Sequence, residues 1–129
     1  MTAPVGDLSG LKVLVVEDEA LVAMVIEDAL NEFGCIVAGV AATVAQALGE
    51  LQAAADLDIA ILDVNLGGEK VFPVADALRA RKVPFLFSTG YGPADLAQRY
   101  PESRLLGKPY SPDALAEALT ALRKGAAGG

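Results

Sequence analysis

Carboxylic acids stand at the ends of two apolar runs in this sequence. They are Glu17, Asp18 and Glu19, directly after KVLVV, and Asp63, the last residue of DIAILD. Carboxylates that lie close together repel one another, so they hold a proton or bind a hard cation. A ligand set made only of oxygen favours Mg²⁺ over zinc or copper. The acids therefore predict a Mg²⁺ site, provided that the fold brings the two runs together.

A hydroxyl and an ammonium group stand at the ends of two further runs. Thr89 is the last residue of PFLFST, and Lys108 directly follows RLLG. Taken singly, Thr89 is explained as a β-branched strand residue, Lys108 as a solvated charge and Glu19 as an acid in the first turn of a helix. Together with the other acids, they supply what phosphoryl transfer needs: a carboxylate nucleophile, a metal ion, a cation and a hydroxyl donor. The set therefore points to phosphoryl chemistry.

Five apolar runs alternate with helical patterns along the chain. The runs are KVLVV (12–16), CIVAGV (35–40), DIAILD (58–63), PFLFST (84–89) and RLLG (104–107). Runs without polar alternation are typical of strands covered on both faces, and their alternation with helices requires a parallel sheet with right-handed crossovers. We therefore predict an α/β fold, a doubly wound (βα)5 three-layer sandwich with a five-stranded parallel sheet. In such a fold ligands bind beyond the carboxyl ends of the strands, where the acids, the hydroxyl and the lysine would meet.

The helical patterns differ in strength. Apolar spacing predicts helices over about 21–33, 44–51, 71–78 and 112–122, with Gly34 as a C-terminal cap of the first and a capping box of Thr43 and Gln46 at the second. Few apolar residues are available between Pro93 and Tyr100, so the fourth helix is predicted to be short and mobile. We expect an N-terminal extension at 1–9, one domain at 10–124 and a flexible tail at 125–129.

Composition excludes several classes of function. A chain of 129 residues fits one domain. Its net charge of −7 argues against direct binding of nucleic acid, because phosphate contacts need a basic face. The absence of His rules out His-based zinc sites and His-activated nucleophiles. The single Cys35 is expected to be a buried small hydrophobe. Without a signal segment or an apolar run of about 20 residues, no membrane contact is expected and the location is predicted to be cytoplasmic.

These residues resemble the receiver domain of two-component response regulators over residues 10–124. The match lies in the acidic pair Glu17-Asp18, in Asp63, in Thr89-Gly90 and in Lys108-Pro109, each after its own predicted strand. The resemblance implies a flavodoxin-like fold, with Asp63 as the phosphoacceptor and Thr89 and Lys108 on the phosphoryl oxygens. It also implies that Mg²⁺ is bound by the side chains of Asp18 and Asp63, by the backbone carbonyl of Asn65 and, through water, by Glu17.

Two positions depart from the common receiver pattern. Leu105 stands where most receivers have a switch aromatic, and Gly67 stands where most have proline, four residues after the phosphoacceptor. The stretch FSTGYG at 87–92 resembles a receiver subgroup with a Phe-Ala-Thr-Gly signature that also lacks the switch aromatic. That subgroup is often paired with histidine kinases of the HWE type. We therefore expect the conformational response to lie in residues 89–104 rather than in a ring at position 105.

The resemblance implies a single-domain response regulator that is a phosphoacceptor and not an enzyme. A sensor histidine kinase or a histidine phosphotransfer protein would supply the phosphoryl group, with docking expected near Ala20 and Leu21 and at the loop of Pro109 and Tyr110. An unidentified protein target would receive the signal. The alternative is a Mg²⁺-dependent phosphatase or phosphotransferase with an Asp nucleophile. Such enzymes usually carry a second Asp two residues after the first, and here that residue is Asn65.

Overall fold

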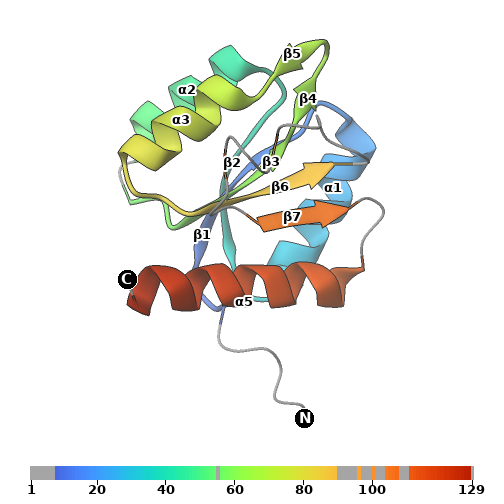
Figure 1. Ribbon diagram of the computed structural model, residues 1–129. Helices are drawn as coiled ribbons and strands as arrows, with labels where there is room; N and C mark the ends of the chain where they lie inside the picture. The colour runs from blue at the N-terminus through green and yellow to red at the C-terminus, as the bar shows by residue number, and fades with distance from the viewer. Residues whose placement is uncertain are drawn as a thin grey trace.

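Five parallel strands form the central sheet of the protein, in the order β2-β1-β3-β6-β7 (Figure 1). The strands are β1 (Lys12–Val16), β2 (Ile36–Ala41), β3 (Ile59–Asp63), β6 (Phe85–Thr89) and β7 (Arg104–Gly107). The structure is a computed structural model that describes residues 8–54, 56–89, 96, 100, 104–107 and 111–128. All five predicted strands are confirmed, and each begins within one residue of its predicted start.

Helices cover both faces of this sheet. They are α1 (Ala20–Glu32), α2 (Val44–Ala53), α3 (Phe72–Ala80) and α5 (Pro112–Gly128). In Figure 1, α2 and α3 lie on one side of the sheet, and α1 and α5 lie on the other. The predicted doubly wound three-layer sandwich is therefore confirmed. Apart from Leu96 and Tyr100, the fourth predicted helix lies outside the described residues.

The helix ends follow the capping signals in the sequence. Thr43 Oγ1 accepts a hydrogen bond from the Gln46 N–H at 3.1 Å, which satisfies one of the donors that a helix start leaves unpaired. Gln46 Oε1 accepts from the Ala42 N–H at 2.8 Å, one residue earlier than in the usual capping box. Gly34, directly after the C-cap of α1, has φ of +84°, a conformation that favours glycine.

The last helix is longer than its apolar spacing predicted. The spacing predicted a helix over about 112–122, whereas α5 continues through Gly128. Ala126 and Ala127 have the highest intrinsic helix propensity, and each residue added to an existing helix gains a further backbone hydrogen bond. The glycines at this end therefore do not stop the helix where the sequence pattern indicated.

The core consists of two apolar layers, one on each face of the sheet. One layer packs β-strand residues against α2 and α3, and the other packs them against α1 and α5. Cys35 lies buried in the second layer, where burial raises the pKa of its thiol. Its Sγ–H donates to the Leu8 carbonyl oxygen at 3.5 Å. The prediction of a buried small hydrophobe is confirmed, since only 7% of the Cys35 surface is exposed.

A short antiparallel hairpin between β3 and α3 was not predicted. Its strands are β4 (Asn65–Leu66) and β5 (Glu69–Lys70), joined by Gly67 and Gly68. Both glycines have positive φ, +57° and +96°, as a two-residue hairpin turn of the primed type requires. The Gly-Gly dipeptide between two short segments was the signal that could have predicted this hairpin.

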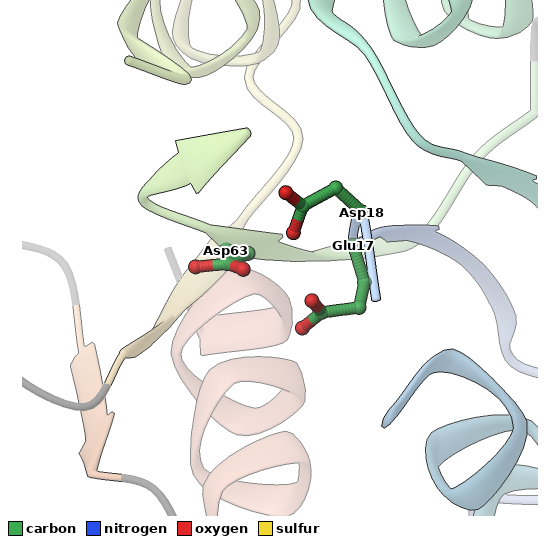
Figure 2. Close-up of side chains that lie close together, drawn as sticks. All are labelled: Glu17, Asp18 and Asp63. Atoms are coloured by element: carbon green, nitrogen blue, oxygen red, sulfur yellow. The ribbon is translucent and has the colours of Figure 1, made fainter. Parts of the chain in front are cut away.

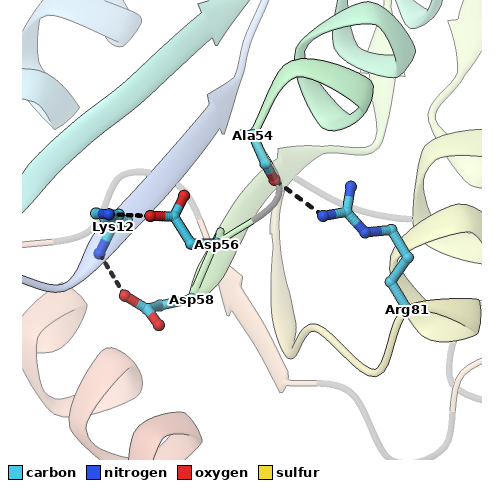
Figure 3. A network of polar contacts seen from close by, with 5 residues as sticks. All are labelled: Lys12, Ala54, Asp56, Asp58 and Arg81. Atoms are coloured by element: carbon cyan, nitrogen blue, oxygen red, sulfur yellow. Dashed lines mark hydrogen bonds and ion pairs between the residues drawn. The ribbon is translucent and has the colours of Figure 1, made fainter.

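Polar contacts tie the chain together near the amino ends of β1 and β3 (Figure 3). The backbone N–H of Lys12 donates to Asp58 Oδ2 at 2.8 Å, and the Lys12 ammonium group pairs with Asp56. Hydrogen bonding to this ammonium lowers the pKa of Asp56. Arg81 donates to the Leu51 carbonyl and, at 2.9 Å, to the Ala54 carbonyl, which satisfies carbonyl groups at the end of α2. Charged residues near this edge are thus engaged in structural contacts.

Tyr100 anchors the chain to α3 and β6 just before β7. Its ring is buried among Phe72, Phe85 and Phe87, with centroid distances of 5.6, 6.0 and 5.3 Å. Its hydroxyl donates to Asp76 Oδ1 at 2.7 Å, and the Arg79 guanidinium carbon lies 4.5 Å from the ring centre. Packing, a charge-assisted hydrogen bond and a cation–π contact therefore converge on one side chain.

This geometry predicts a measurable coupling between Tyr100 and Asp76. Tyr100→Phe should lower the free energy of unfolding by about 1 kcal/mol because it removes a hydrogen bond to a charged acceptor at a partly exposed site. Urea unfolding of Tyr100→Phe, Asp76→Ala and the double variant provides the test. The double variant should lose less than the sum of the single losses, and strict additivity would show that the bond contributes nothing.

Candidate functional site

The pairing of the strands brings the predicted site residues to one edge of the sheet. Val16 of β1 pairs with Leu62 of β3, so the next residues, Glu17 and Asp63, emerge at the same level. Asp63 in turn pairs with Ser88 of β6, which places Thr89 one residue beyond it. The strand order changes direction between β1 and β3, and this is where ligands bind in folds of this topology.

Three carboxylates meet at this edge (Figure 2). Glu17, Asp18 and Asp63 each offer an oxygen atom, and these atoms all lie within 4.8 Å of one another. Glu17 and Asp63 are buried, with 2% and 8% of their surface exposed, whereas Asp18 is exposed. Close approach of like charges under partial burial is unfavourable, because low local polarity strengthens their repulsion. The site therefore favours a compensating positive charge.

Backbone N–H groups hold each of these carboxylates in place. Glu17 Oε2 accepts from the Glu19 N–H at 3.1 Å, and Asp63 Oδ1 accepts from the Asn65 N–H at 3.3 Å. Asp18 Oδ2 accepts from the Gly67 N–H, in the turn of the β4–β5 hairpin, at 2.8 Å. Such bonds restrict the orientation of each carboxylate, so the three acids are held close together.

The donor set fits a hard divalent cation. Mg²⁺ holds its oxygen ligands at about 2.1 Å in octahedral geometry, so opposite ligands lie about 4.2 Å apart. Oxygen atoms within 4.8 Å of one another can surround such an ion with small side-chain rotations or with one ligand acting through water. The described part of this cluster contains only oxygen ligands, which do not favour zinc or copper.

Of the remaining predicted site residues, the structure describes Thr89 and Asn65 but not Lys108. Thr89 lies buried at the end of β6 and pairs with Gly107 of β7. Lys108, the residue after Gly107, lies outside the described residues. The backbone N–H of Asn65, two residues after Asp63, donates a hydrogen bond to the Asp63 carboxylate. The described geometry thus brings Glu17, Asp18 and Asp63 together, with Thr89 at the end of the neighbouring strand.

Leu105 is one of the two departures that the sequence showed. Its side chain lies on β7 and is 53% exposed, and its backbone pairs with Phe87 of β6. A ring from outside the sheet, that of Tyr100, packs against Phe87, and the two ring centroids lie 5.3 Å apart. The second departure, Gly67, turned out to be the hydrogen-bond partner of Asp18, a contact that sequence reasoning missed.

Comparison with known proteins decides the family. Residues 13–120 match the family defined as the response regulator receiver domain. The chain belongs to this family. The receiver resemblance seen in the sequence is thereby confirmed, and it places the chain in two-component phosphorelay signalling. Among the described residues of this receiver, no helix is long and apolar enough to cross a membrane.

Individual relatives agree with this assignment. The receiver is 32% identical over 104 residues to the phyllosphere-induced regulator PhyR of Methylorubrum extorquens, covering 78% of this chain and 39% of that protein. It is similar to SdrG of Sphingomonas melonis Fr1, with 45% identity and a TM-score of 0.77 over 88% of this chain and 96% of the SdrG chain. The response regulator PhyR of Brucella abortus shares the fold, with 24% identity and a TM-score of 0.85 over 96% of this chain and 52% of its own. The chain thus spans about half or less of these PhyR proteins and almost the full SdrG chain.

The carboxylate cluster predicts a specific response of stability to charge. Asp63→Asn should raise the free energy of unfolding by about 1 kcal/mol in EDTA, because it removes one of three mutually repelling charges. With Mg²⁺ at about 100 times its dissociation constant, the wild type should gain about 2.7 kcal/mol and the variant much less. Chemical denaturation with and without Mg²⁺ measures both effects.

Glu19→Gln is the matched control, because Glu19 is adjacent in sequence but its carboxylate is not one of the three. It should leave the gain with Mg²⁺ unchanged. A destabilised Asp63→Asn variant in EDTA, or one that keeps the full gain with Mg²⁺, would contradict the electrostatic account of the site.

Proposed function

We propose that this receiver accepts a phosphoryl group on Asp63 with the help of Mg²⁺. The donor is the phosphohistidine of a sensor histidine kinase or of a histidine phosphotransfer protein. The observation that carries the proposal is the convergence of Glu17, Asp18 and Asp63 within 4.8 Å at the carboxyl edge of a receiver sheet. The signal then leaves through contacts with another protein, and a cytoplasmic location stays a prediction of the sequence.

Asp63 acts as the nucleophile in this proposal. One of its carboxylate oxygens forms a bond to phosphorus while the bond between phosphorus and the imidazole nitrogen of the donor breaks, with the electron pair returning to the imidazole. The hydrogen bond from the Asn65 N–H restricts rotation of the Asp63 carboxylate. Burial of Asp63 reduces competition from bulk water for the same oxygen atoms.

Four residues would hold the metal ion. Asp18 and Asp63 would bind it through their side chains, Glu17 would contribute through water, and Asn65 would contribute its backbone carbonyl. When bound, Mg²⁺ supplies positive charge beside the incoming phosphoryl oxygens. The separation between the carboxylate oxygens, which all lie within 4.8 Å of one another, supports a hard cation.

The hairpin ladder supports the proposed role of the Asn65 carbonyl. The Val71 N–H donates to the Val64 carbonyl at 2.9 Å, so the next pair, Asn65 and Lys70, is a non-hydrogen-bonded pair of the ladder. The polar backbone groups of Asn65 therefore point away from Lys70. Its N–H reaches Asp63, and the carbonyl of the same extended residue points to the same side.

Thr89 and Lys108 would hold the phosphoryl oxygens. Thr89 ends β6, the strand next to Asp63, and Lys108 directly follows Gly107, the partner of Thr89 on β7. A hydroxyl donor and an ammonium group on these oxygens would offset the charge that the phosphoryl group brings. The acyl phosphate would therefore last long enough to act as a signal.

We infer that the protein is a phosphoacceptor rather than a turnover enzyme. The alternative phosphatase needs an acid two residues after the nucleophile, and Asn65 cannot donate a proton in that role. Slow self-catalysed phosphorylation and dephosphorylation are compatible with the proposed site. No observation on the described residues favours the phosphatase.

The kinase is proposed to dock on α1, which begins directly after the acidic residues. Leu21, Met24 and Val25 form an apolar stripe on this helix, with 77%, 56% and 66% of their surface exposed. Spacing of three and four residues places them on one helical face, as in helix-to-helix recognition. The second part of the predicted docking site, Pro109 and Tyr110, lies outside the described residues. A kinase of the HWE type is the proposed partner, on the basis of the FSTGYG signature.

Incubation with acetyl phosphate and Mg²⁺ tests the phosphoacceptor. Intact mass spectrometry should detect one base-labile phosphoryl adduct on the wild type, because an acyl phosphate hydrolyses readily in base. Asp63→Ala should give no adduct. An equal adduct on Asp63→Ala would contradict the proposal.

A wild type that reacts with no small donor calls for a second measurement. NMR spectra with beryllofluoride, a phosphoryl mimic, should then show shifts around Asp63 and Thr89 that depend on Mg²⁺. Unchanged spectra would also sink the proposal, because they would show that the site accepts neither the phosphoryl group nor its mimic.

A further inference from the structure

The turn of the β4–β5 hairpin contacts the acidic cluster through one backbone group. The Gly67 N–H donates to Asp18 Oδ2 at 2.8 Å, across 49 positions in the chain. Asp18 is the exposed member of the cluster, whereas Glu17 and Asp63 are buried. An exposed carboxylate samples several rotamers unless a partner holds it, so this hydrogen bond limits where the Asp18 side chain can lie.

The conformation of the turn explains why this N–H is available. In a two-residue hairpin the first turn residue does not donate to the ladder, because the ladder bonds join the flanking pair. Gly67 adopts φ of +57° and Gly68 φ of +96°, which glycine accepts without strain. The N–H of the first turn residue therefore points out of the hairpin, toward the loop that follows β1.

The hairpin itself is held firmly against β3. Leu66 is buried with 3% of its surface exposed, and Val71 at the base is fully buried. The Val71 N–H donates to the Val64 carbonyl at 2.9 Å, and Lys70 Nζ donates to Asn65 Oδ1 at 2.5 Å. The position of the Gly67 N–H is thus determined by the same short segment that carries Asp63 and Asn65.

We propose that Gly67 is a positioning residue for the cation site: its N–H holds the Asp18 carboxylate beside Asp63 before the ion arrives, and so raises the affinity for a divalent cation. This inference rests on the proposed function, because it requires that a cation binds at the cluster. The hydrogen bond also joins the loop after β1 to the segment after β3, which are the two segments that supply the carboxylates. Preorganisation lowers the entropy that binding must overcome.

Replacement of one amide by an ester tests the role of the Gly67 N–H directly. Glycolic acid at position 67 removes the donor and keeps the glycine-like turn, and the same replacement at position 68 is the matched control. Mn²⁺ serves as the probe, with free ion measured by electron paramagnetic resonance and Mg²⁺ affinity measured by competition. The position 67 ester should bind Mn²⁺ about tenfold more weakly, as is typical when a partner of a metal ligand is lost. The position 68 ester should bind within about twofold of the wild type.

A pair of ordinary substitutions tests the same idea where the esters do not yield folded protein. Gly67→Asn should keep the affinity, because Asn accepts positive φ and Asn-Gly is a preferred turn pair. Gly67→Val should weaken it about tenfold, because a β-branched residue resists positive φ and would redirect the N–H. Unfolding free energies in EDTA separate a loss of fold stability from a loss of affinity.

The outcomes separate this inference from the proposed function. A wild type that binds neither Mn²⁺ nor Mg²⁺ would overturn both. A wild type that binds the ion while the position 67 ester or Gly67→Val binds it equally well would overturn the positioning role alone. Lower stability of these variants with unchanged affinity would also overturn it, because the hairpin turn would then be purely structural.

Discussion

Repulsion among three carboxylates at one edge of the sheet is the constraint on which the site depends. The pairing of β1 with β3 places Glu17 and Asp63 at the same level, and Asp18 comes within reach from the following residue. Three backbone N–H groups restrict the orientation of these acids. Carboxylates this close together repel one another, so the geometry of this edge favours a cation beside them.

The rigid layers of the fold make such a strained edge possible. Two apolar layers enclose the sheet, and β1, β3 and β6 are buried along nearly their whole length. Burial of this apolar surface supplies the stability against which a few unfavourable charge contacts are small. Polar contacts of Lys12 and Arg81 lie near the amino ends of the strands, away from the acids. The charges of Lys12 and Arg81 thus lie at the opposite ends of the strands from the three carboxylates.

Aromatic packing near the site also differs from the common receiver pattern. Leu105 is half exposed on β7 and has no ring to contribute, whereas Tyr100 lies buried against Phe87, two residues before Thr89 in the same strand. The hydroxyl of Tyr100 further connects this ring to Asp76 on α3. Phe87, Tyr100 and Asp76 thus form a chain of contacts from β6, the strand that ends in Thr89, to α3. The response expected in residues 89–104 stays a prediction, since most of that segment lies outside the described residues.

The sequence by itself determined the sheet, four of the helices and the identity of the acids. Apolar runs without alternation predict buried parallel strands, and helical spacing with caps such as Thr43 and Gly34 predicts where helices begin and end. These are local patterns, so they can be read without coordinates. The end of α5 was missed because the glycines near the C-terminus suggested a break that the intervening alanines overcame.

Only the tertiary structure decided that the Gly67 N–H reaches Asp18. That contact joins residues 49 positions apart, and it depends on the pairing of β1 with β3 and on the direction of a two-residue turn. Register and turn direction arise from packing across the whole sheet, and no local pattern in the sequence specifies which oxygen atom a distant N–H will meet.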